Sequence, residues 1–193
     1  MGILWSRLKQ RREMRKVLSK VGPTTHFAKH EAEYWMKIFY KDVPTGKLSE
    51  AEFVEYFGNF YTATDDRSKS TLARQIFKAF DRNNNGHVSL REYLMGMSTL
   101  LRGDALEKLE WSFILFDLDG DGLVSKEDME GVLMLYNDLR MNKEGGKSDE
   151  QLAAIVDQEF NLIDRAGKGR LGKRQFIEGV SRSFRLLDIM PIR

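Results

Sequence analysis

The chain has no cysteine and only three prolines among its 193 residues, and it has no apolar run of the roughly eighteen residues that a transmembrane helix needs. Without cysteine no disulfide can form, which fits a reducing, cytoplasmic setting. Because prolines occur only at 23, 44 and 191, long helices can continue without interruption. Arg7 and Lys9 interrupt the first apolar residues, so we expect neither a secretory signal nor a membrane-spanning segment.

The composition indicates a folded protein with one strongly basic end. Hydrophobic residues make up 41% of the chain and aromatic residues 11%, which is enough for one large core or two small ones. The formal net charge is +2. The first 22 residues hold seven cations and a single acidic residue, Glu13, so this segment carries the positive charge and the remainder is acidic.

One segment, residues 81–92, fills every fixed position of a calcium-binding loop, the D-x-[DN]-x-[DN]-G-x5-E motif of EF-hands. Calcium takes roughly six to eight oxygen ligands, and this spacing directs oxygens from alternate residues toward one point. Gly86 allows the sharp turn, and Ser89 at the ninth position acts directly or through a water. The predicted calcium ligands of this segment are Asp81, Asn83, Asn85, the carbonyl of His87, and Glu92.

A second candidate loop occupies residues 117–128, and its last ligand is an aspartate instead of a glutamate. Aspartate is one methylene shorter and tends to offer one oxygen where Ca²⁺ prefers two, which favours the octahedral coordination of Mg²⁺. We therefore expect Ca²⁺, Mg²⁺ or both at this loop. The predicted ligands are Asp117, Asp119, Asp121, the carbonyl of Leu123, and Asp128.

Two further segments, residues 41–52 and 164–175, repeat the same frame without the ligand set. Lys41, Ala166 and Lys168 occupy positions that need oxygen ligands. An ammonium group at such a position repels a dication, so we expect neither segment to bind metal. All four segments keep an aliphatic residue at the eighth position, where paired EF-hands form a short strand. These residues are Leu48, Val88, Val124 and Leu171.

The four repeats predict an all-α fold of four EF-hand helix-loop-helix units in two lobes with short paired loop strands. The predicted divisions are a basic arm over residues 1–22, a first EF-hand pair over 23–101 and a second pair over 104–190. A Gly-Gly pair and alternating charge also predict an internal loop at residues 141–147.

The amino-terminal residues Met-Gly-Ile-Leu-Trp-Ser match the pattern for myristoylation of Gly2. One myristoyl chain gives only reversible membrane binding, with an association constant of about 10⁴ M⁻¹. Each nearby cation adds on the order of 1 kcal/mol at an anionic leaflet, so we expect acylated Gly2 and the basic arm together to hold the protein at the membrane periphery. A solvated helix face is the alternative for this charge run. No base-reading module accompanies it, and we predict no nucleic-acid partner.

With these features the chain resembles the neuronal calcium sensor family, the recoverin and visinin-like group. The resemblance covers about residues 27–187 and rests on the four repeats, the Gly2 site, the Val-Pro-Thr-Gly segment at 43–46 and the Lys-Leu-Glu-Trp-Ser-Phe segment at 108–113. It implies a hydrophobic groove that holds either the acyl chain or a helix of a target protein. The aromatic residues assigned to this groove are Phe27, Trp35, Phe39, Phe53, Phe57 and Phe60.

Two functions stay open at this point. The resemblance implies a calcium sensor that regulates a target enzyme, receptor kinase or channel at a membrane, with calcium extruding the acyl group. The alternative is a constitutively anchored calcium buffer, or a structural EF-hand subunit of a channel or kinase complex. No nucleophile accompanied by a base is recognisable in the sequence, so we predict that the chain is not an enzyme.

Overall fold

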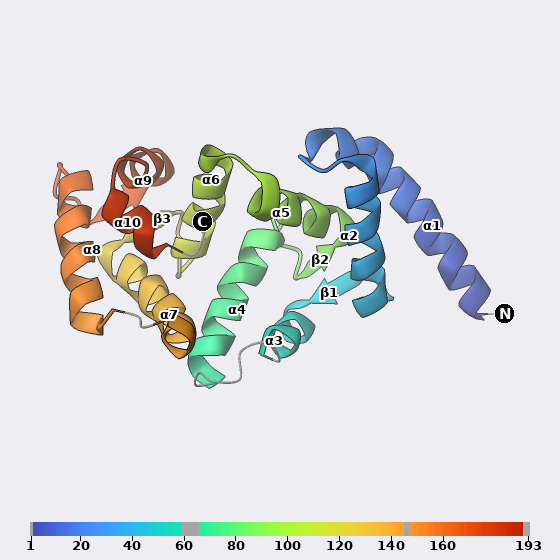
Figure 1. Ribbon diagram of the computed structural model, residues 1–193, viewed down its shortest axis with the longest axis horizontal. Coiled ribbons are helices and arrows are strands. Elements are labelled where there is room, and N and C mark those ends of the chain that lie inside the picture. Colours follow the sequence, from blue (N-terminus) through green and yellow to red (C-terminus); the bar gives the residue numbers. More distant parts are fainter. Residues whose placement is uncertain (1, 59–65, 145–146, 191–193) are drawn as a thin grey trace. The chain divides into compact units, whose positions relative to one another are not determined.

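The computed structural model describes the backbone of residues 2–58, 66–144 and 147–190, which form helices joined by short loops and two pairs of short strands (Figure 1). This confirms the predicted all-α class. The chain divides into two compact units. Unit 1 comprises residues 1–52 and 80–104, and unit 2 comprises residues 53–79 and 105–193. Residues 53–79, which the sequence division assigned to the first pair, thus group with unit 2, and the predicted pair boundaries stay a prediction.

Unit 1 consists of helices that carry a two-stranded sheet. Its elements are α1 (Gly2–Val21), the short 3-10 helix η1 (Gly22–Thr24), α2 (Lys29–Asp42), β1 (Lys47–Ser49), β2 (His87–Ser89) and α5 (Leu90–Arg102). Helix α3 (Glu50–Gly58) begins in unit 1, and helix α4 (Asp66–Phe80) ends there.

The core of unit 1 lies where α2 and α5 meet. Met36 and Phe39 of α2 and Leu90 and Leu94 of α5 are almost completely buried. The ring of Phe39 packs against that of Tyr93, with the centroids 5.0 Å apart. We call this group the aromatic cluster. Its buried members are Phe27, Ala32, Met36, Phe39, Tyr40, Val43, Leu90 and Leu94, and Trp35, Leu48, Tyr93 and Met97 pack against them.

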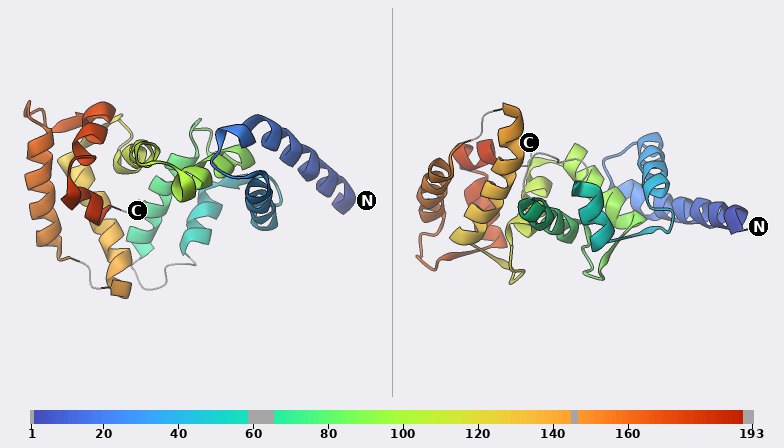
Figure 2. Two further views of the ribbon diagram at one scale, coloured as in Figure 1. Left: turned by 45° about the horizontal axis from the view of Figure 1, so that its top comes forward. Right: turned by 90° about the horizontal axis from the view of Figure 1, so that it is seen from below.

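Helix α1 occupies the segment for which the sequence predicted a basic arm, with a solvated helix face as the alternative. Figure 2 shows this segment as one continuous helix. Met14, Val17 and Leu18 pack against the aromatic cluster, and the apolar face of α1 therefore covers it. The Tyr40 hydroxyl donates to Glu13 Oε2 at 2.7 Å. Burial and this bond to a carboxylate raise the pKa of Tyr40, so its hydroxyl stays protonated and keeps donating.

Unit 2 repeats the helix-loop-helix arrangement around a second core. Its remaining elements are α6 (Ala105–Phe116), β3 (Leu123–Ser125), α7 (Lys126–Glu144), α8 (Asp149–Ile163), β4 (Arg170–Gly172), α9 (Lys173–Val180) and α10 (Phe184–Ile189). Phe176 of α9 is fully buried, and its ring centroid lies 5.6 Å from those of Phe113 and Phe116. The predicted loop at residues 141–147 is wrong for its first part, because α7 continues to Glu144.

The strands join the loops in pairs, as the aliphatic residues at the eighth position predicted. β1 and β2 are antiparallel with Leu48 opposite Val88, and β3 and β4 are antiparallel with Val124 opposite Leu171. The two loops of each pair are therefore fixed back to back. No helix in the described part of the chain has the length and apolar character that crossing a membrane requires.

Candidate metal centres

The loop at residues 81–92, called loop 2, is wound around the carboxylate of Asp81. Asp81 follows α4 directly and is only 5% exposed. Its two oxygens accept hydrogen bonds from the backbone amides of Asn85 and Gly86, at 3.1 and 2.8 Å. Gly86 has a φ of 80°, a conformation that a residue with a side chain rarely adopts. The first predicted ligand is thus already oriented toward the inside of the turn.

Glu92 closes loop 2 from its other end. One carboxylate oxygen, Oε2, accepts hydrogen bonds from the amide and hydroxyl of Ser89, at 3.0 and 2.7 Å, and so caps α5. The other oxygen, Oε1, accepts from the side chain of Asn83. Glu92 therefore spans the loop with both oxygens. Asp81, Asn83, Asn85 and Glu92 supply the oxygen donors that suit Ca²⁺. The Asn83 amide, whose nitrogen donates to Glu92 here, would rotate to present its oxygen to an ion.

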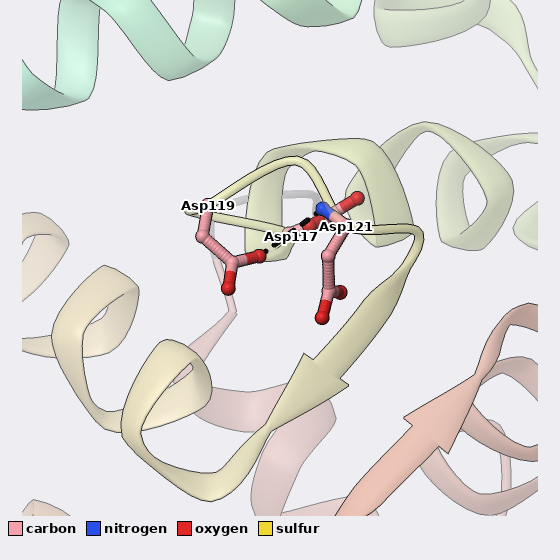
Figure 3. Close-up of side chains that lie close together, drawn as sticks. All are labelled: Asp117, Asp119 and Asp121. Carbon is pink, nitrogen blue, oxygen red and sulfur yellow. Dashed lines mark hydrogen bonds between the residues drawn. The ribbon is translucent and has the colours of Figure 1, made fainter.

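The loop at residues 117–128, called loop 3, gathers three carboxylates at its surface. Asp117, Asp119 and Asp121 each place a carboxylate oxygen within 4.8 Å of the others (Figure 3). Asp117 accepts from the amides of Gly120 and Gly122 at 2.9 and 3.0 Å, the arrangement seen at Asp81. Burial, together with the charges of Asp119 and Asp121, raises the pKa of Asp117. A dication would relieve this repulsion, so the donor set fits Ca²⁺ or Mg²⁺.

Two contacts distinguish loop 3 from loop 2. Among the described residues, the Asp128 carboxylate accepts hydrogen bonds from Ser125 alone, whose amide and hydroxyl both donate to Oδ2. The Asp128 amide in turn donates to the Ser125 hydroxyl oxygen. Asp128 does not span the loop as Glu92 does. The guanidinium of Arg170, which lies on β4, forms an ion pair with Asp121 Oδ2. The contact of Arg170 could not be predicted from the sequence, because a pairing between two loops leaves no signal in the spacing of either.

Loops 1 (residues 41–52) and 4 (residues 164–175) use the same frame for structure. In loop 1, Glu52 accepts from the Ser49 amide at 2.8 Å and caps α3 in the manner of Glu92. In loop 4, Asp164 Oδ2 accepts from the Gly169 amide at 2.6 Å and so holds the turn. The frame thus survives in both loops, although Lys41, Ala166 and Lys168 occupy other positions that need oxygen ligands.

The aromatic residues predicted for the groove separate into two groups. Phe27, Trp35 and Phe39 lie in the aromatic cluster of unit 1, with the rings of Phe27 and Trp35 stacked at 6.2 Å. Phe53 and Phe57 lie in unit 2, where Phe53 contacts Phe77 at 5.8 Å. Phe60 lies outside the described residues. The groove itself stays a prediction.

Each loop and its two flanking helices form one hand, which takes the number of its loop. Gly96 of hand 2 has a packing role that was not predicted from the sequence. A Cβ atom on Gly96 of α5 would lie 2.3 Å from the ring of Phe80, the last residue of α4. Only glycine lets α5 approach the ring of Phe80 this closely. In hand 4, Gly179 has the same relation to Ile163, at 2.5 Å. The recurrence of glycine at this position of the repeat was the signal that could have revealed it.

Comparison with known proteins matches both loops that hold a ligand set. The family model described as EF hand matches residues 73–97 and 110–134, which contain loops 2 and 3. The chain is 26% identical to recoverin of Homo sapiens over 182 residues, which are 91% of this chain and 88% of that protein. It is 30% identical to guanylyl cyclase-activating protein 1 of Gallus gallus over 160 residues, or 83% and 77% of the two chains. It is 31% identical to guanylyl cyclase-activating protein 2 of Lithobates pipiens over 153 residues, or 77% and 76%. The chain therefore belongs to the neuronal calcium sensor family of EF-hand calcium-binding proteins.

Proposed function

We propose that this protein is a calcium sensor in which loop 2 carries the response and a target protein at a membrane receives it. The observation that carries the proposal is the position of Glu92, which bridges Asn83 and Ser89 and is the third residue of α5. A bound calcium ion supplies two positive charges that Asp81 and Glu92 neutralise. When Glu92 moves to bind an ion, the first turn of α5 must therefore move with it.

Helix α5 connects loop 2 to the aromatic cluster. Leu90 and Leu94 are buried in the cluster, and Tyr93 and Met97 pack against it. Met14, Val17 and Leu18 of α1 cover the same cluster. A rotation of α5 must therefore alter the packing of α1. This gives loop 2 a route to expose apolar surface for a target helix, as sensor EF-hands do when their helices open.

Loop 3 has a different part in the proposal. Its four carboxylates favour a dication strongly, but the short reach of Asp128 favours Mg²⁺ relative to Ca²⁺. We assign it a Mg²⁺ or mixed site that stabilises unit 2. Helix α4 contacts this loop, because Gln75 Nε2 and Lys78 Nζ donate to the carbonyl of Leu118 at 3.0 and 3.1 Å. Occupancy of loop 3 therefore affects the helix that precedes loop 2.

The substitution Glu92→Gln tests the sensor proposal. It removes the anionic bridging ligand and keeps the size of the side chain, so we expect the calcium affinity of loop 2 to fall about a hundredfold, or about 2.7 kcal/mol. The calcium-dependent rise in binding of an apolar fluorescent dye should disappear at constant millimolar Mg²⁺. The matched control is Glu52→Gln, which makes the same change in loop 1 at the same position. A dye response that survives Glu92→Gln, or one that disappears in both variants, would overturn the assignment.

The membrane part of the proposal combines acylation of Gly2 with the cations of α1. Helix α1 begins at Gly2, so an acyl chain there would be attached directly to the helix that covers the aromatic cluster. We expect the acylated protein to sediment with anionic vesicles more completely in Ca²⁺ than in chelator, and Gly2→Ala to release most of it. Equal sedimentation of the acylated protein in both conditions would contradict a calcium-driven switch and leave a permanent anchor.

The names of two relatives suggest the first target to assay. Both guanylyl cyclase-activating proteins are named for their action on a cyclase. We therefore propose a membrane-bound guanylyl cyclase as one target class for this chain, alongside receptor kinases and channels. Cyclase activity should depend on calcium in the presence of the parent protein and lose that dependence with Glu92→Gln.

A further inference from the structure

Unit 1 contains a basic cavity that the calcium chemistry does not use. It has a volume of about 780 Å³ and lies between α1 and the first turn of α5. It is open to solvent, because the cations that line it are exposed. Five cationic side chains line it, with the carboxylate of Glu13 beside them. The cations are Lys9, Arg12, Lys16, Lys20 and Arg91.

The cations gather because of the helical repeat. Residues 9, 12, 16 and 20 recur at intervals of three or four and so lie on one face of α1. Met14, Val17 and Leu18 lie on the adjacent face, which is fixed against the aromatic cluster. Docking of the apolar face therefore holds the cationic face beside α5, where Arg91 completes the cavity. Arg91 comes from a different helix, so the cavity is more than a linear basic segment.

These charges are left without compensation. Within the part of the chain that the structure describes, none of the five cations forms an ion pair with a carboxylate. Glu13 is engaged elsewhere, because its Oε2 accepts the hydroxyl of Tyr40 at 2.7 Å. Like charges three and four residues apart destabilise a helix. A bound anion would remove this repulsion.

The excess of positive charge defines the class of anion. A single carboxylate brings one negative charge, whereas a phosphomonoester brings about −1.5 to −2 at pH 7 and three acceptor oxygens. Two phosphomonoesters therefore match five cations opposed by one carboxylate. The arginines add planar donor groups that bind phosphate oxygens in pairs. A ligand with two phosphomonoesters fits the cavity better than a carboxylate or a simple phosphodiester.

We propose that this cavity binds the phosphomonoester groups of a membrane lipid headgroup. Lys9 is about 10 Å along the helix from Gly2, because each residue rises about 1.5 Å. An acyl chain on Gly2 and a headgroup in the cavity would thus contact the same membrane surface. The inference rests on the membrane part of the proposed function and adds to it the lipid class. Attachment would depend on the headgroup and not on surface charge alone.

Vesicle binding by the unacylated Gly2→Ala protein in chelator tests the proposal apart from acylation and calcium. The vesicles are phosphatidylcholine with phosphatidylinositol 4,5-bisphosphate, or phosphatidylcholine with phosphatidylserine at equal total charge. We expect at least tenfold tighter binding to the bisphosphate vesicles. Because each cation near the surface contributes on the order of 1 kcal/mol, the double variant Arg12→Gln and Lys16→Gln should weaken that binding at least tenfold.

Two controls separate the cavity from general attraction. The double variant Arg11→Gln and Arg15→Gln removes the same charge from α1, but these exposed residues do not line the cavity, and binding should stay within twofold. Arg91→Gln should weaken binding about fivefold although it lies outside the basic arm. Circular dichroism of each variant checks that α1 and the fold remain.

Two results would overturn the inference. Equal losses from both double variants, or equal binding to the two kinds of vesicle, would show general electrostatic attraction. Binding of soluble inositol 1,4,5-trisphosphate as tightly as the bisphosphate vesicles would assign the cavity to a free phosphate ligand. Neither result bears on calcium sensing, since loop 2 is empty of calcium in every arm of the experiment. A loss of the calcium response in the dye assay would likewise leave this measurement unaffected.

Discussion

Loop 2 has two predicted carboxylate ligands and loop 3 has four, but the burial and the neighbouring charges of the two loops counteract the stronger attraction that loop 3 would otherwise have for a dication. In loop 2, Asp81 and Glu92 are 5% and 9% exposed. Asp119 and Asp121 of loop 3 are exposed, and Arg170 of loop 4 pairs with Asp121. Loop 1 contributes no such cation to loop 2 among the described contacts. The number of carboxylates therefore does not rank the two sites by itself.

The last ligand shows a second difference. Glu92 hydrogen bonds at both ends of its carboxylate, to Asn83 and to Ser89. Asp128 reaches only Ser125 among the described residues. A bidentate ligand suits the larger Ca²⁺, whereas Mg²⁺ accepts single oxygens in an octahedron. We therefore propose that loop 2 responds to Ca²⁺ and that loop 3 is the loop suited to Mg²⁺.

The helices around the two loops also pack differently. Gly96 in hand 2 brings α5 against the ring of Phe80. The same position in hand 3 is Val132, which is fully buried. In hand 2, α5 thus approaches Phe80 so closely that one methyl group would obstruct the contact, whereas hand 3 carries a larger side chain at the same position.

The largest expected effect comes from breaking this contact with Gly96→Ala. The new Cβ atom would lie 2.3 Å from the buried Phe80 ring, so α4 and α5 must separate or the ring must move. Overpacking of this kind costs about 1–3 kcal/mol of folding stability. We expect apolar dye binding in chelator to rise toward the level of the calcium-loaded parent, and denaturant unfolding to measure the loss of stability.

Gly179→Ala is the matched control for this prediction. It places a Cβ atom 2.5 Å from Ile163 in hand 4 and should cost similar stability. Because loop 4 lacks the ligand set, it should leave the calcium affinity of loop 2 within about twofold, or about 0.4 kcal/mol. If both variants raise dye binding in chelator equally, general loosening and not the opening of hand 2 is responsible.

The sequence predicted the loops well because their geometry is local. Ligand spacing, the turn glycines and the residues at the eighth position all lie within one twelve-residue frame, and the strand register confirmed the pairing of Leu48 with Val88. The packing of α1 against α2 and α5 was not predictable in this way, because its apolar face is short and lies among cations. The contact of Arg170 with Asp121 joins residues of different loops. The Gly-Gly pair marked the end of α7 but placed it too early, since Met141 and Glu144 favour helix.

Exchanging the residues at the twelfth position of loops 2 and 3 tests whether side-chain length sets the choice of ion. Asp128→Glu lengthens the side chain by one methylene, so loop 3 should gain about tenfold in its preference for Ca²⁺ over Mg²⁺, or about 1.4 kcal/mol. The reciprocal change Glu92→Asp should shift loop 2 in the opposite direction. Calorimetric titration with Ca²⁺ in the presence and absence of Mg²⁺ measures both. Strong selection of Ca²⁺ by the parent loop 3 in millimolar Mg²⁺ would contradict the role given to Asp128.

The smallest expected effect concerns Arg170, whose ion pair with Asp121 competes with a dication for the same oxygen. Both side chains are partly exposed, at 52% and 34%, and exposed ion pairs contribute about 0.2–1 kcal/mol. Arg170→Gln should therefore raise the affinity of loop 3 for Ca²⁺ or Mg²⁺ by only about 1.4- to fivefold. Arg174→Gln removes the same charge from a residue that pairs with Glu178 instead, and serves as the control. The gain should shrink at about 1 M salt, where the Debye length is about 3 Å. If both variants raise the affinity equally, the net charge of unit 2 and not the contact with Asp121 limits metal binding at loop 3. A decrease with Arg170→Gln would mean that the guanidinium orients Asp121 for the ion and does not compete with it.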